Sequence, residues 1–339
     1  MSLADLWFAL FILIVGAYLI LDGFDLGVGI LHLPLARTDD ERRTMLASIG
    51  PVWDGNEVWL VVTGGVLFAV FPLVYASLFS GFYLAFMLVL LTLILRTVAI
   101  EFRSKEPGMR WRRSWDVVFA AASTGLALLL GIAFGNIVKG LPIDSAGNMQ
   151  VTLVELLDPF ALLFGVATVV MFAMQGALYL VVKTDGELQA RVRAVVPRIM
   201  AAFVVVGLLV VGALVVQDRQ VIRRFVHDIW PLVVPIAALA TFAGAWRMHR
   251  AQRDLAAFAC SSVTIGLVVI AGGLGMYPDL LISTVDPAYS LSTTNAASAD
   301  GTLVVCLIVA LIGIPFVLLY TSGVYYIFRG KARVEPEGY

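Results

Sequence analysis

The sequence predicts an all-α, polytopic membrane protein with nine transmembrane helices. Of its 339 residues, 60% are hydrophobic and only 14% are charged, and the mean hydropathy is +0.95. This balance excludes an ordinary soluble domain. Runs of roughly 20 apolar residues, the length that crosses the hydrocarbon core of a bilayer, recur along the whole chain. The net charge of −1 says little about partners, and no feature indicates nucleic acid.

Nine apolar runs are long enough to be spans. In chain order they cover about residues 6–33, 52–71, 74–100, 115–138, 159–182, 196–216, 229–246, 255–276 and 302–328. Pro72 marks an abrupt turn between the second and third runs, and charged or polar connections separate the others. The longest connection, 277–300, has no Lys or Arg and is rich in Ser, Thr, Asn and Ala. It is either an ordered external lid or a plain polar loop.

The basic residues test this count and orient the chain. Alternate connections and the C-terminal tail carry 18 Lys and Arg residues, the opposite connections carry 4, and Arg96 lies within a span. Because basic residues favour the cytoplasmic side, the N-terminus is predicted outside and the C-terminus inside. The first and fifth spans resemble each other faintly. We therefore expect one transmembrane domain over 1–339, with four-helix bundles at 1–138 and 159–276 and a ninth, peripheral helix at 302–328.

Ionisable side chains interrupt the first three spans. They are Asp22, Asp25, Asp54, Glu57, Arg96 and Glu101, and the predicted orientation places all six in the cytoplasmic half. Charges at membrane depth are costly and mark proton or ion pathways by default. Desolvation raises the proton affinity of a carboxylate, and a neighbouring Arg lowers it. The pattern therefore predicts a group of residues that takes up and passes on protons.

Structural roles for the same residues remain open. Asp22 could snorkel to the interface or cap a helix, and Asp54 could be the N-cap of the second span. Glu57 in the first turn also suits the helix dipole. Asp25 and Arg96 could form an ion pair that braces two helices. The glycines of Gly27-Val-Gly29 and Gly64-Gly65 are read as helix-contact residues, because neither pair follows a strand.

Metal and haem ligands are scarce. The three histidines, His32, His227 and His249, do not form a facing pair at one depth, as a bis-histidine haem needs. Cys260 and Cys306 lie in apolar runs without metal-like spacing. We expect no metal and no haem bound by this chain itself.

Several segments resemble subunit II of the cytochrome bd quinol oxidases, over about residues 6–331. They are Asp22-Gly-Phe-Asp-Leu-Gly-Val-Gly29, Pro51-Val-Trp-Asp-Gly-Asn-Glu-Val-Trp-Leu60, Phe68-Ala-Val-Phe-Pro-Leu-Val-Tyr-Ala76, Leu95-Arg-Thr-Val-Ala-Ile-Glu-Phe-Arg103, Tyr289-Ser-Leu-Ser-Thr-Thr-Asn-Ala-Ala-Ser298, Pro315-Phe-Val-Leu-Leu-Tyr-Thr321 and Phe328-Arg-Gly-Lys331. The resemblance implies two four-helix bundles plus one peripheral helix, paired with subunit I.

That family implies an activity for the complex, not for this chain alone. Subunit I carries the quinol site, two b-type haems, and haem d or a third haem b. The complex oxidises quinol and reduces oxygen to water in the bacterial cytoplasmic (inner) membrane, taking the protons for water from the cytoplasm. In the family, residues matching Asp25, Asp54 and Arg96 belong to or support this proton path, and Glu57 can be a Gln. A structural quinone, membrane lipids and a small accessory subunit are further partners that the resemblance allows.

The sequence leaves three candidate functions for this chain. The first is a haem-free oxidase subunit that holds its partner and conducts protons, and the second is a scaffold alone. The third, from another class, is a proton-coupled secondary transporter that uses Asp22 and Asp25. Transporters tend to have broken helices at corresponding positions of two halves. Here the prolines well inside spans, Pro235 and Pro315, do not correspond.

Overall fold

Helices make up nearly all of the structure. The computed structural model describes residues 2–217, 220–227 and 230–333. Its α-helices are α1 (Leu3–Leu35), α2 (Asp39–Ile49), α3 (Trp53–Val70), α4 (Pro72–Gly81), α5 (Tyr83–Phe102), α6 (Met109–Lys139), α7 (Pro159–Lys183), α8 (Gly186–Val216), α9 (Gln220–His227), α10 (Val233–Arg250), α11 (Asp254–Met276) and α12 (Asp300–Ile327). Its connections contain the 3-10 turns Glu155–Leu157, Trp230–Leu232 and Pro287–Tyr289, and the strands β1 (Asp279–Leu281) and β2 (Leu291–Ser292).

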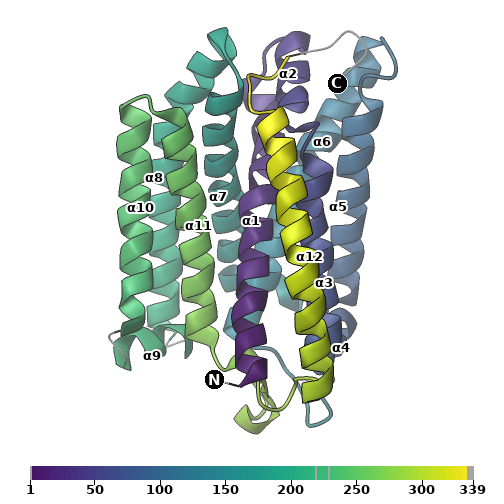
Figure 1. Ribbon diagram of the computed structural model, residues 1–339, viewed down its shortest axis with the longest axis vertical. Helices are drawn as coiled ribbons and strands as arrows, with labels where there is room; N and C mark the ends of the chain where they lie inside the picture. The colour runs from purple at the N-terminus through teal and green to yellow at the C-terminus, as the bar shows by residue number, and fades with distance from the viewer. Residues whose placement is uncertain (1, 218–219, 228–229, 334–339) are drawn as a thin grey trace.

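The long helices run side by side along one axis (Figure 1). Helices α8, α10 and α11 lie on one side and α3, α5 and α6 on the other, with α1 and α12 between them. Helix α1 packs against α3, α6, α7 and α11, and α7 also packs against α6 and α8. The first helix is therefore the centre of the fold. Short α2 lies at one end of the bundle, and α9 lies at the other end, near the start of α1 (Figure 1).

Local chemistry defines the starts of α1 and α7. The Ser2 hydroxyl accepts a hydrogen bond from the Asp5 amide, and the Asp5 carboxylate accepts one from the Ser2 amide. This capping box satisfies two amides that have no partner in the helix. Helix α7 begins with Pro159 at its first position, and Asp158 accepts a hydrogen bond from the Ala161 amide.

Two glycines allow α1 and α7 to cross at backbone contact. A Cβ atom on Gly27 would lie 1.9 Å from the carbonyl oxygen of Phe172, and one on Gly176 would lie 2.4 Å from the carbonyl carbon of Gly27. The contact role predicted for Gly27 is confirmed. The same prediction is wrong within this chain for Gly64 and Gly65, because a Cβ atom there would meet nothing within 4 Å.

The predicted spans correspond to helices, with differences at two places. Among the described residues, eight helices are long and apolar enough to cross a membrane. Helix α3, the counterpart of the predicted second span, is not one of them, because Asp54, Asn56 and Glu57 lower the hydropathy of its first turns. The protein is thus a helical, multi-pass membrane protein. The count of nine spans, the orientation and the division into two bundles stay predictions.

The region after α3 shows the other difference. Helix α3 ends at Val70 and α4 begins at Pro72, which confirms the abrupt turn predicted at this proline. The predicted third span, 74–100, is not one helix. It is interrupted at Phe82, between α4 and α5, where φ is −94° and ψ is 21°.

The connection 277–300 is ordered. Strands β1 and β2 pair antiparallel within it, and the Thr284 amide donates to the Leu141 carbonyl. The Ser298 amide donates to the Val70 carbonyl, and the Thr293 hydroxyl donates to Asp5 at the start of α1. These bonds tie the connection to the start of α1, to the last residue of α3 and to the segment after α6. Its predicted external position depends on the orientation and stays a prediction.

Candidate functional site

The two acids of α1 lie in its most enclosed part. All residues from Asp22 to Gly29 are buried, and both Asp22 and Asp25 are 0% exposed. A stretch of helix that is buried on every face is surrounded by other helices. Both carboxyl groups therefore lie inside the protein, and Asp22 does not snorkel toward the helix end.

Arg96 of α5 forms an ion pair with Asp22. Its Nη2 lies 2.6 Å from Asp22 Oδ1, and its Nη1 lies 3.6 Å from Glu57 Oε2 of α3. The ion pair that the sequence left open between Asp25 and Arg96 is not the one observed. Asp22 and Asp25 are three positions apart, and Asp25 instead makes its hydrogen bond to α3.

Asn56 of α3 connects Asp25 to the last helix. Its Nδ2 donates to Asp25 Oδ2 at 2.7 Å, and its Oδ1 accepts from the Tyr325 hydroxyl of α12 at 2.9 Å. The Asn56 side chain is buried at 1% exposure. The sequence predicted no role for Asn56 or Tyr325. An amide between two acids in an apolar run was a signal for Asn56, whereas nothing local distinguishes Tyr325.

Several polar atoms of this group have no hydrogen-bond partner among the described residues. They are Asp25 Oδ1, Glu57 Oε2 and Arg96 Nε. Buried polar atoms normally have a partner in the protein or an ordered water. Such atoms are concentrated around Asp25 and Arg96.

Asp54 and Glu57 lead from the protein surface to this group. Asp54 is exposed, the Glu57 side chain is 21% exposed, and the side chains of Arg96 and Asp22 are fully buried. The predicted N-cap role of Asp54 is wrong. The helix begins one residue earlier, at Trp53, and its N-cap is Val52.

Glu101 completes the predicted set. It is half-buried and precedes the last residue of α5. The structure thus brings together Asp22, Asp25, Glu57 and Arg96 and places Asp54 beside them at the surface.

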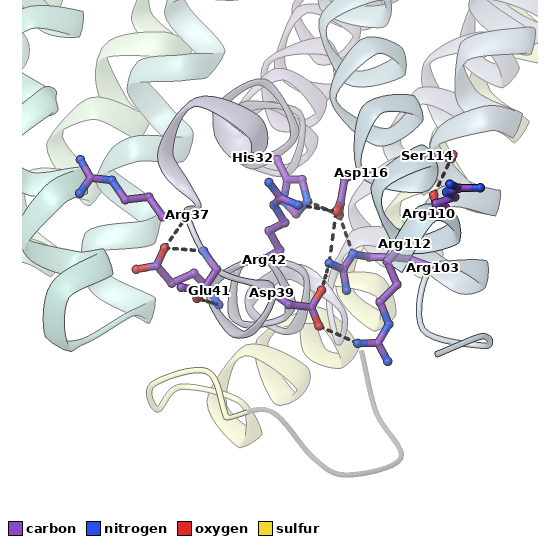
Figure 2. A network of polar contacts seen from close by, with 11 residues as sticks. His32, Arg37, Asp39, Glu41, Arg42, Arg103, Arg110, Arg112, Ser114 and Asp116 are labelled. Carbon is purple, nitrogen blue, oxygen red and sulfur yellow. Dashed lines mark hydrogen bonds and ion pairs between the residues drawn. The ribbon is translucent and has the colours of Figure 1, made fainter. Parts of the chain in front are cut away.

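A second polar network lies at the α2 end of the bundle (Figure 2). Asp116 of α6 is its centre: Oδ1 is 2.8 Å from His32 Nε2 and 2.5 Å from Arg103 Nε, and Oδ2 is 3.2 Å from Arg42 Nη1. Arg103 also reaches Asp39 at 2.7 Å, and Arg112 of α6 pairs with the other oxygen of Asp39 at 2.7 Å. These bonds hold α2 against α1, α5 and α6. The sequence did not indicate this network, because α2 is too short and too polar to register as a span.

The other side of α2 is held by Glu41. Arg191 of α8 donates to both oxygens of this carboxylate, at 2.9 and 3.1 Å. Burial alone would raise the pKa of Glu41, but the hydrogen bonds from Arg191 and from the backbone amides of Arg37 and Thr38 outweigh burial and lower it. The pKa of Asp39 is lowered in the same way, because its bonds to Arg103 and Arg112 outweigh its burial.

Comparison with known proteins identifies the family. Residues 3–328 match the family described as cytochrome bd terminal oxidase subunit II. The chain belongs to this family. It is 36% identical to the cytochrome bd-I ubiquinol oxidase subunit 2 of Escherichia coli K12, covering 97% of this chain and 94% of the relative. It is 34% identical to the cytochrome bd ubiquinol oxidase subunit 2 of Bacillus subtilis 168, covering 100% and 99%.

A solved structure shares the fold. A chain of the bd oxidase from Geobacillus thermodenitrificans superposes with a TM-score of 0.79 at 17% sequence identity, covering 97% of this chain and 99% of that one. As a subunit II, this chain is part of an oxidoreductase complex with a subunit I partner, and the haems of the family lie in that partner. Within the described residues, no group of three or more His, Cys, Asp or Glu could hold a metal ion.

Proposed function

We propose that this subunit II provides part of the cytoplasmic proton-uptake path of a terminal quinol oxidase that reduces oxygen to water. The observation that carries the proposal is the sequence of increasing burial from Asp54 through Glu57 to Arg96 and Asp22, with Asp25 beside them. Acids placed in this order can carry a proton from the surface into a dry interior. Passing one charge against 100 mV costs about 2.3 kcal/mol, so such a path must be narrow and enclosed.

Each residue has a proposed part. Asp54 collects protons at the surface, and Glu57 receives them at the entrance. The Arg96–Asp22 ion pair joins α5 to α1 and fixes the inner end of this series of acids. Asp25 has no ion pair within the described structure and one oxygen without a partner, so it is the acid that gains and loses the proton. Glu101 has a supporting part.

The second part of the proposal is that this subunit binds no haem and holds subunit I in place. The partner then carries the quinol site, two b-type haems, and haem d or a third haem b. Nine spans in two four-helix bundles plus α12, with the N-terminus outside, are proposed for the bacterial inner membrane. Lipids, a structural quinone and a small accessory subunit are proposed as further components. Family membership leaves no observation that favours the proton-coupled transporter.

The test uses the complex purified through a tag on this chain, with Asp25→Asn and Asp54→Asn as variants. Asp40→Asn is the matched control, because Asp40 is an exposed acid of α2 at the same end of the bundle. Haem content is read from the reduced-minus-oxidised spectrum, and turnover from quinol-driven oxygen uptake. The proposal expects turnover to fall by tenfold or more with haem content unchanged in both variants and a normal control.

Two other outcomes reject parts of the proposal. Loss of haem or of subunit I together with activity would leave the scaffold role and reject the proton path. Full turnover in both variants would place the path elsewhere.

A further inference from the structure

A groove on α6 combines an apolar floor with a basic end. Its apolar part has a volume of about 420 Å³ and is lined by Ile30, Leu33 and Pro34 of α1 and by small residues of α6 that include Ala120, Ala121 and Gly125. A second hollow, of about 540 Å³, is lined by Arg110, Arg113, Ser114 and Val117. Val117 lines both, so the two hollows adjoin at this residue. Both are shallow and open outward from α6.

The two arginines of this groove differ from their neighbours. Arg103 and Arg112 are neutralised by Asp39 and Asp116. Arg110 and Arg113, by contrast, make no ion pair with any described residue. Figure 2 shows Arg110 at the edge of the view, outside the network around Asp116, with only the Ser114 hydroxyl donating to its carbonyl oxygen. Two uncompensated positive charges therefore stand at one end of an apolar groove.

Aromatic residues place this basic end at the membrane surface. Trp111 and Trp115 lie on the same turns of α6 as Arg110 and Ser114, with their rings 5.6 Å apart, and the Trp111 indole donates to the Phe102 carbonyl at 2.9 Å. Tryptophan is enriched at the level of lipid headgroups. From Val117 onward the groove follows the apolar part of α6, so its long direction follows a lipid chain.

We propose that the groove binds an anionic phospholipid. Its phosphate lies between Arg110 and Arg113, beside Ser114, and one acyl chain lies along Leu33, Pro34 and the small residues of α6. Basic residues beside the membrane-water boundary attract anionic lipid headgroups. The net charge of the headgroup selects this lipid over a zwitterionic one, and the apolar floor selects a lipid over a free phosphate ion. The inference does not depend on the proton path.

The test is lipid retention by the whole delipidated complex, measured by native mass spectrometry after addition of phosphatidylglycerol or phosphatidylcholine. Arg110→Gln/Arg113→Gln removes the headgroup contacts, and Ala121→Phe fills the groove at an exposed position. The matched control is Arg247→Gln/Arg253→Gln, which removes the same charge at the ends of α10 and α11. One basic residue near an anionic headgroup contributes about fivefold in affinity, so the double variant should lose roughly 30-fold.

The expected result is preferential retention of phosphatidylglycerol by the wild type and the control, loss of that preference in the double arginine variant, and loss of the lipid in Ala121→Phe. Equal retention of both lipids would overturn the headgroup contact. Retention unchanged in both groove variants would overturn the site. If inorganic phosphate displaces the retained phosphatidylglycerol and Ala121→Phe does not change its retention, the arginines form an anion site without a groove for the acyl chain.

Discussion

Asn56 is the residue whose replacement tests the buried site most sharply. Asn56→Leu keeps the number and branching of the side-chain heavy atoms but removes both hydrogen bonds of the side chain. Asp25 Oδ2 then loses its donor and the Tyr325 hydroxyl loses its acceptor. Each buried polar group left without a partner costs about 1–3 kcal/mol, so the pair predicts a destabilisation of about 2–6 kcal/mol. Tyr325→Phe leaves only Asn56 Oδ1 unpaired and should cost about half as much.

The assay compares the apparent melting temperature of the complex with quinol-driven oxygen uptake across pH. Asn56→Asp separates the effect on melting temperature from the effect on turnover. Its side chain still accepts the hydrogen bond from Tyr325, but it puts a new carboxyl group next to Asp25. Two carboxylates this close share a proton, so the pH profile of turnover should change. Asn148→Leu, at an exposed position, controls for the substitution itself. Wild-type melting and an unchanged pH profile in the Asn56 variants would refute the reasoning.

Three further results are expected. Gly176→Ala should prevent close packing of α1 and α7 and lower the melting temperature strongly, whereas Gly207→Ala, where a Cβ atom meets nothing within 4 Å, should be neutral or stabilising by up to ~1 kcal/mol. Asp116→Asn removes the carboxylate shared by Arg103 and Arg42 and leaves the buried Arg103 with Asp39 alone. It should cost up to about 3–5 kcal/mol, measured as earlier thermal loss of the complex. Because the pKa values of Asp39 and Glu41 are lowered in the fold, their stabilisation is complete above their ordinary values, near pH 4, and is lost as the pH falls through the lowered ones. The difference in melting temperature between wild type and Asp39→Asn/Glu41→Gln should therefore be constant from pH 5 to 7 and vanish in acid. A difference that grows in acid would contradict the lowered pKa values of the two carboxyl groups.

The sequence predicted what depends on local pattern. Long apolar runs became helices, Pro72 became a turn, and the enclosed acids could be identified because charges in such runs are rare. It could not predict which side chains form ion pairs and hydrogen bonds with each other. Arg96 needed a carboxylate partner, but the choice of Asp22 over Asp25 depends on how α5 and α3 are placed around α1. The Tyr325–Asn56 bond joins residues 269 positions apart, and no local signal marks it.

The short helix α2 was also not predicted from the sequence. Hydropathy detects helices that bury themselves in lipid, whereas α2 is held by ion pairs and by its capping box of Thr38 and Glu41. Its residues were visible only as part of the basic connection that oriented the chain. The capping box was nevertheless present as Thr-x-x-Glu, a pattern that marks a helix start.

Helix α12 is attached to the rest of the chain at both ends and almost nowhere between. The Trp7 indole donates to the Leu303 carbonyl near its start, and Tyr325 binds Asn56 near its finish. Of its 28 residues, Leu303 alone is buried within this chain. Between these two ends α12 turns large apolar side chains such as Leu311, Phe316 and Leu319 outward. Most of its length is therefore stabilised by whatever surrounds the chain in the membrane, lipid or another subunit, and not by contacts within this chain.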